Sequence, residues 1–290
     1  MPSITRPPLH PDLAQVHDQL PKNENISTPE EIAIRRKTLN FSLEDVLRGR
    51  EHLITHEETT FPGPAGPLQA SIFRPKKTNN ANASTTITPG ILHIHGGGHI
   101  AGTRFLGIEA VLDWVVDLGA IIVSAEYRFA PEHPQPAQLE DSYAALTWMS
   151  AHAHEIGFSP AHLVVCGGSA GGNLAAGVFA DVAPWTRANS VDACDYALGR
   201  DRERASVYTV PGRATDLSGL PATWIDVGDA DVFRDEDVAY ASKLWRAGVS
   251  TELHVWPGCW HAFDIFVPDA PVSRRVRRAR SEWLRRLLLE

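Results

Sequence analysis

The stretch from His162 to Ala176 constrains the fold more than any other part of this sequence. Its apolar run stops at a pair of glycines before Ser169, and small residues with helical character follow. This order predicts a strand, a sharp turn and a helix. Residues 167–171 match the G-x-S-x-G pattern, in which a strained turn holds a serine hydroxyl above the sheet. Ser169 is therefore a candidate nucleophile, and the alternative is a glycine-rich turn whose serine is unreactive.

Strands and helices alternate through the rest of the chain. After a hairpin expected at 52–60 and 68–74, the apolar runs indicate strands at 90–95, 120–125, 222–227 and 252–256. Helical periodicity lies between them, at 104–118, 135–155, 235–247 and from about 272. The alternation predicts an α/β fold with a mostly parallel central sheet and helices on both faces. In such sheets the chemistry sits at the carboxyl ends of the strands.

The first part of the chain reads differently from the rest. Residues 1–50 are helical pieces separated by prolines, and Ser27 to Glu31 carry the signals of a helix start. We expect a helical N-terminal cap or lid there, and a catalytic domain over residues 51–290. A chain of 290 residues fits a single α/β domain.

The composition limits the class of partner. A formal net charge of −8 argues against binding to nucleic acid, because a phosphate polymer would be repelled. The three cysteines form no C-x-x-C pair, so neither a disulfide framework nor a zinc site is indicated. No apolar leader or membrane-spanning run is present, and we expect a cytoplasmic protein without stable membrane insertion. A homodimer is left open.

A second glycine-rich run follows the strand predicted at 90–95. His95 is followed by Gly96, Gly97 and Gly98, so backbone N–H groups lie at the strand end with no side chains in the way. Such a loop can form an oxyanion hole together with the N–H of Ala170, the residue after the elbow serine. A metal site at the nearby histidines is the weaker reading, because the run holds no acidic or thiol partner.

A nucleophilic serine needs a base and an acid that orients the base, and both should lie downstream at strand ends. His261 follows the strand at 252–256 and is the candidate base. Three acids crowd the end of the strand at 222–227: Asp226, Asp229 and Asp231. Spacing alone does not separate them.

Five motifs occur in one order along the chain: His95 to Gly98, Glu126 to Glu132, Gly167 to Gly172, Asp231 to Glu236, and His261 to Phe263. With these motifs the chain, from about residue 40 to its end, resembles the hormone-sensitive lipase family of α/β-hydrolase carboxylesterases. The resemblance implies an α/β-hydrolase fold with Ser169 as nucleophile, Asp231 as orienting acid and His261 as general base. It also implies an oxyanion hole formed by the N–H groups of Gly97, Gly98 and Ala170, and no metal or cofactor.

The chain departs from the family pattern in three places. Gly168 stands where Asp is common, and Ala262 stands where Gly is usual. The third departure is a shortened region over 175–216, where we find no apolar run for a further central strand. Unless the sheet closes up, the loss of a strand would leave neighbouring backbone groups unpaired.

The leading hypothesis is a serine hydrolase that cleaves carboxylic esters of small acyl groups through an acyl-enzyme. One alternative is a hydrolase dedicated to a lactone, a thioester or a polyketide-type ester, since all pass through the same kind of tetrahedral intermediate. The other is an inactive relative that binds small molecules, which the missing strand would favour.

Overall fold

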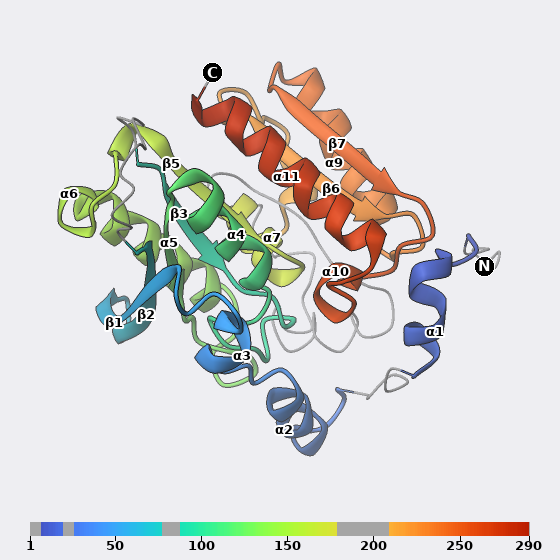
Figure 1. Ribbon diagram of the computed structural model, residues 1–290, viewed down its shortest axis with the longest axis horizontal. Coiled ribbons are helices and arrows are strands. Elements are labelled where there is room, and N and C mark those ends of the chain that lie inside the picture. The colour runs from blue at the N-terminus through green and yellow to red at the C-terminus, as the bar shows by residue number, and fades with distance from the viewer. Residues whose placement is uncertain (1–6, 20–25, 77–87, 179–208, 290) are drawn as a thin grey trace.

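The computed structural model describes residues 7–19, 26–76, 88–178 and 209–289, which contain two sheets flanked by helices (Figure 1). The strands are β1 (Ile54–Gly63), β2 (Gly66–Pro75), β3 (Gly90–Ile94), β4 (Ile121–Ala125), β5 (Leu163–Gly167), β6 (Thr223–Gly228) and β7 (Thr251–Trp256). The helices are α1 (Pro11–Gln19), α2 (Pro29–Thr38), α3 (Leu43–Leu47), α4 (Glu109–Leu118), α5 (Ala137–Ala151), α6 (Ala153–Ile156), α7 (Ala170–Gly177), α9 (Arg234–Arg246), α10 (Phe263–Phe266) and α11 (Pro271–Leu289).

The first sheet has the order β1-β2-β4-β3-β5. Strands β4, β3 and β5 run parallel, whereas β2 pairs antiparallel with β4 and forms a hairpin with β1. Every residue of β3 and β4 is buried, because their continuous apolar sequence is covered on both faces. Successive side chains point to opposite faces, so Ile91 packs in the cluster that contains α4 and Leu92 in the cluster that contains α5.

The second sheet consists of β6 and β7, which pair in parallel. Among the described residues no strand joins β5 to β6, so the single central sheet that we expected is divided in two here. All five residues of β5 are partly exposed, in contrast to the buried β3. Residues 179–208, which hold most of the shortened region, lie outside the described residues.

Helix α11 contacts both parts of the molecule, and Figure 1 shows it running beside both α4 and β6. Leu284 and Leu288 are buried in the cluster that includes α4, and Trp114 donates a hydrogen bond from Nε1 to Ser281 Oγ at 2.9 Å. The basic residues of α11 are mostly exposed on its other faces. Helix α11 therefore combines a solvated basic face with a docked apolar stripe.

Some boundaries differ from the sequence expectations. Helix α2 begins as predicted, with Thr28 and Glu31 forming a capping box. The hairpin turn is tighter than predicted, because β1 extends through Pro62 to Gly63. Helix α4 begins at Glu109, five residues later than expected, because residues 104–108 form turns. On α9, the large apolar side chain of Trp245 is 49% exposed.

Candidate active site

Ser169 lies in a strained turn between β5 and α7. Its φ of 56° and ψ of −124° are unusual for a residue with a side chain. The neighbouring glycines are sterically required, since a Cβ atom on Gly167 would lie 2.3 Å from Gly171 O and one on Gly171 would lie 2.0 Å from Ile94 O. Gly168, by contrast, has open space around its Cβ position, so the structure tolerates glycine or a side chain there.

Ser169, His261 and Asp231 form a continuous hydrogen-bonded chain. Ser169 Oγ lies 2.9 Å from His261 Nε2, and His261 Nδ1 lies 2.9 Å from Asp231 Oδ2. The Asp231 side chain is only 7% exposed, and its Oδ1 accepts from Phe233 N at 3.1 Å. With His261 Nδ1 donating to the carboxylate, Nε2 is free to accept the serine proton.

The structure separates the three acids that spacing left open. Asp231 reaches His261, whereas Asp229 Oδ1 accepts from Gly258 N at 2.6 Å. Asp226 accepts from Arg280, Trp224 and Trp256 inside the fold. Of these three carboxylates, only that of Asp231 bonds His261, the candidate base.

The sequence motif Asp231 to Glu236 contains a contact that the sequence reasoning missed. The ring of Phe233 meets the His261 ring edge-on, with centroids 4.8 Å apart. Phe233 thus contacts the base through its ring and the acid through its backbone. An aromatic residue two positions after the acid was the available signal.

A fourth carboxyl group lies near the triad. Burial raises the pKa of Asp237, on α9, from the usual value of 3.8 to about 7, and the charge of Asp231 adds to this effect. Asp237 is therefore mostly a neutral acid below about pH 7.

The glycine loop after β3 lies against the elbow. A Cβ atom on Gly96 would lie 2.9 Å from Gly168 O and 3.5 Å from Ser169 Cβ. Gly97 and Gly98 have φ values of 111° and 71°, which favour glycine. The three predicted oxyanion donors therefore come from two neighbouring segments, with Ala170 as the first residue of α7.

Tyr127 contacts the start of this loop through both its hydroxyl and its ring. Its hydroxyl donates to His95 O at 3.0 Å, and its ring stacks on the His95 ring at 4.2 Å. His95 Nδ1 donates in turn to Gly96 O at 2.7 Å. These contacts hold the backbone at the start of the glycine run.

The histidines near β3 serve packing and hydrogen bonding. Burial lowers the pKa of His93 to about 3 and that of His99 to about 4. His93 Nδ1 bonds Ser124 Oγ at 2.8 Å. Among the residues that the structure describes, no group of three or more His, Cys, Asp or Glu side chains could hold a metal ion.

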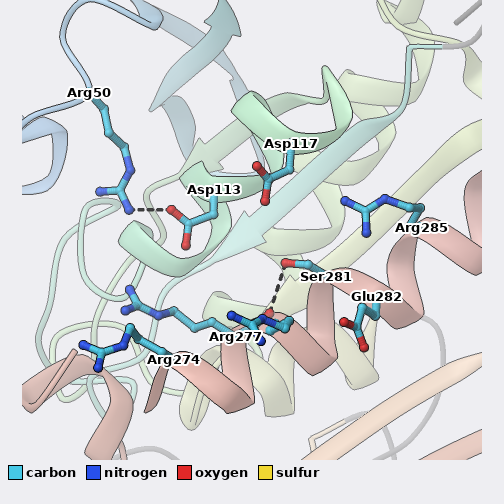
Figure 2. Close-up of a pocket in the computed structure, with 9 residues that line it drawn as sticks. Arg50, Asp113, Asp117, Arg274, Arg277, Ser281, Glu282 and Arg285 are labelled. Atoms are coloured by element: carbon cyan, nitrogen blue, oxygen red, sulfur yellow. Dashed lines mark hydrogen bonds and ion pairs between the residues drawn. The ribbon is translucent and has the colours of Figure 1, made fainter. Parts of the chain in front are cut away.

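A charged groove of about 370 Å³ lies between α4 and α11, away from the triad (Figure 2). Arginines line it together with Asp113, Asp117 and Glu282, and Arg50 pairs with Asp113 at 2.5 Å. Five arginines face three carboxylates in its lining, so the groove carries an excess of positive charge.

Trp256 and Trp260, which lie shortly before His261 in the sequence, are packing residues. Trp260 is 8% exposed and lies in a cluster with Leu13 and Phe263. Trp256 stacks on His254 and donates to Asp226. No helix within the described ranges is long and apolar enough to cross a membrane.

Comparisons with known proteins identify the family. A family model described as alpha/beta hydrolase fold matches residues 91–184 and 178–265. The chain is 30% identical to "Esterase LipI" of Mycobacterium tuberculosis over 92% of both chains, and 29% identical to "Carboxylesterase NlhH" of the same species over 94% of both.

Solved structures show the same likeness. A structure titled "Bacterial Heroin Esterase" matches with a TM-score of 0.83 at 30% identity, covering 97% of this chain and 98% of that one. Esterase LipW from Mycobacterium marinum matches with a TM-score of 0.80 at 30% identity over 99% of both chains. This chain therefore belongs to the hormone-sensitive-lipase-like family of α/β-hydrolase carboxylesterases, serine hydrolases that cleave carboxylic esters.

Proposed function

We propose that Ser169 attacks the ester carbonyl, with His261 as general base and Asp231 as the acid that orients it. The observation that carries this assignment is the unbroken chain of two 2.9 Å contacts from Ser169 Oγ through His261 to Asp231. His261 takes the serine proton as the carbon–oxygen bond forms, and returns it to the alcohol that leaves. Water then attacks the acyl-enzyme by the same route and releases the acid.

The negative oxygen of each tetrahedral intermediate needs donors that are already in place. We assign this role to the backbone N–H groups of Gly97, Gly98 and Ala170. The close approach of the glycine loop to the elbow and the absence of side chains on the glycines support the assignment.

The substrates that we propose are esters of small acyl groups. The support is helix α2, the part of the expected N-terminal cap that packs over the loop following the proposed oxyanion glycines. Arg36 fastens it there, donating from Nε to Ile100 O at 2.7 Å and from Nη2 to Ala130 O at 3.1 Å. A cap held this closely to the loop limits the room for a long acyl chain.

The test is hydrolysis of p-nitrophenyl esters from acetate to decanoate. We expect turnover to be highest for the short esters and Ser169→Ala to lower kcat by about 10³-fold or more. Ser242→Ala is the matched control, because that hydroxyl bonds only Val238 O within exposed helix α9. A folded Ser169→Ala variant with wild-type turnover, or wild-type protein that a fluorophosphonate does not label, would refute the assignment.

Comparing a short acyl thioester and a lactone with the oxygen ester separates the dedicated-hydrolase alternative. A kcat/KM for either that far exceeds that of every simple ester would favour it. The inactive-relative alternative is not favoured, because the three side chains are within bonding distance.

We also propose that the protein is a cytoplasmic homodimer. Cys166 and Cys259 are free thiols, which suits a reducing compartment. Strand β7 pairs only with β6 among the described strands, and Val255 on it is 38% exposed, so this edge can pair with a second copy. Light scattering should give twice the chain mass for the wild type and a lower mass for Val255→Lys. Cell fractionation tests the cytoplasmic location.

A further inference from the structure

The three proposed catalytic side chains come from two different sheets. Ser169 follows β5, whereas Asp231 follows β6 and His261 follows β7. No pairing between described strands connects β5 to β6. Within the described residues, the spacing across this junction therefore depends on contacts other than the backbone hydrogen bonds of a shared sheet.

Arg280, on α11, makes the most concentrated set of polar contacts at this junction. Its Nε and Nη2 donate to the two oxygens of Asp226 at 2.9 and 2.8 Å, and its Nη1 donates to Asp264 Oδ2 at 2.6 Å. The side chains of Arg280, Asp226 and Asp264 are 24%, 10% and 9% exposed. Fork-shaped, charge-assisted bonds of this kind fix direction as well as distance.

Both carboxylates belong to elements that lead to a triad residue. Asp226 lies in β6, five residues before Asp231, and Asp264 lies in α10, three residues after His261. Asp226 also accepts from Trp256 Nε1 at 3.2 Å, which ties the end of β7 to the same group. Arg280 therefore contacts the chain on both sides of the acid–base pair.

The charge state of this cluster is stable. Burial opposes charge on Asp226, but Arg280 and the bonds from the indoles keep its pKa below the usual value. Burial likewise opposes charge on Arg280, and the two carboxylates keep its pKa raised. The pair of Arg280 with Asp226 therefore stays charged at neutral pH.

The helix that carries Arg280 is anchored to the first sheet. Trp114 on α4 bonds Ser281, the next residue along α11, and Leu284 is buried one turn further on. Val164 and Cys166 of β5 pack against the apolar cluster that contains Leu284 of α11. Contacts thus run from the serine-bearing half through α11 to the half that bears the acid and base.

We propose that Arg280 is a positioning residue for the triad. Its helix docks on the five-stranded sheet, and its guanidinium binds Asp226 and Asp264. These two ion pairs hold the neighbouring Asp231 and His261 within hydrogen-bond reach of Ser169. Arg280 itself touches no reacting atom. The inference rests on the proposed function, since it presumes that these three side chains are the catalytic ones.

The experiment measures kcat for a short p-nitrophenyl ester per active site titrated with a fluorophosphonate, together with KM and Tm. We expect Arg280→Met to lower kcat per titrated site by about tenfold or more, with KM nearly unchanged, because small misplacements of a base slow the chemistry. Arg280→Lys should fall between Arg280→Met and wild type, since lysine keeps the charge and loses the fork. A merely structural role would lower Tm and the titratable fraction, and leave kcat per site intact.

Asp264→Asn provides a second test that keeps the pair with Asp226. It should lower kcat in the same way, and the double variant Arg280→Met/Asp264→Asn should be no slower than Arg280→Met alone, because one linkage is broken in both. The matched control is Arg286→Met, on the same helix, which pairs with Glu252 at 2.8 Å near the start of β7. Its kcat should stay at the wild-type value.

A folded Arg280→Met with wild-type kcat per site overturns the proposal. If that variant does not fold, wild-type kcat in Asp264→Asn overturns it instead. If Arg280→Met does fold, a loss in the double variant equal to the product of the single losses also overturns the proposal. Ser169→Ala keeps the two ideas apart, with its turnover measured per mole of folded protein because it offers no serine to titrate. If Ser169→Ala is inactive and Arg280→Met is normal, only the positioning role fails; if Ser169→Ala is active, the proposed function itself fails.

Discussion

The two sheets of this esterase are stabilised by different kinds of contact. The five-stranded sheet is packed on both faces by apolar clusters, and β3 and β4 are buried along their whole length. The face of the β6–β7 sheet that meets α11 carries Trp224, Asp226, His254 and Trp256, joined by stacked rings and by ion pairs to Arg280. Apolar packing gives large stability without direction, whereas the polar contacts give direction at a cost of desolvation.

The site lies where these two regions meet. The nucleophile is held by the rigid, apolar part, through glycines that allow β5 and α7 to approach closely. The acid and the base are held by the region of the β6–β7 sheet, whose hydrogen bonds and ion pairs constrain the directions of the side chains. A hydrogen-bond chain with two 2.9 Å links across that boundary needs both properties.

The largest expected effect is a difference in the free energy of unfolding: truncating a leucine should cost more in the five-stranded sheet than in the β6–β7 sheet. Leu92→Ala, in buried β3, should lower the free energy of unfolding by about 2–5 kcal/mol, because it leaves a cavity in a packed core. Leu253→Ala, the same change in partly exposed β7, should cost about 1 kcal/mol. Urea unfolding of both variants measures the difference, and equal losses would show that the second sheet is as tightly packed as the first.

A smaller, pH-dependent effect should appear beside the triad. Because the pKa of Asp237 is raised to about 7 in the folded protein from 3.8, the folded state binds a proton more tightly than the unfolded chain. In the wild type, protonated Asp237 therefore contributes to the free energy of unfolding at low pH. This contribution is lost as the pH rises from about 4 through about 7. Asp237→Asn removes the dependence, so its Tm should exceed that of wild type by a few degrees at pH 8 and match it near pH 4.

The control for that experiment is Asp235→Asn on the same helix, where the bond from Arg234 lowers the pKa of the carboxyl. Its Tm should not rise above wild type at pH 8. If Asp237→Asn shows the same offset from wild type at every pH, the stabilisation does not come from titration of Asp237.

The smallest effect concerns the turn after His261. Ala262 has a φ of 60°, a left-handed conformation in which a Cβ atom is strained. Ala262→Gly should relieve this strain and raise stability by up to about 1 kcal/mol, less the greater entropy of glycine in the unfolded chain. Differential scanning calorimetry should show a small rise in Tm with kcat unchanged; a fall in Tm would mean that the alanine methyl group packs usefully.

Much of this protein could be predicted from the sequence, because the relevant signals are local. The elbow around Ser169 follows from glycine sterics, the alternation of strands and helices follows from apolar periodicity, and the start of α2 follows from its capping residues. The family and the ester chemistry followed from motifs in a fixed order, and the comparisons confirm them. The residue roles within the site stay proposals.

Only the tertiary structure decided which groups meet. Three acids within six residues look alike in sequence, and Asp231 differs from Asp226 and Asp229 only in what the fold places beside it. The exposure of Trp245, the division of the described strands into two sheets, and the contacts of Arg280 were likewise invisible in local patterns. The physical reason is that periodicity specifies which face of an element is buried, whereas side chains distant in sequence become neighbours only through packing of the whole chain.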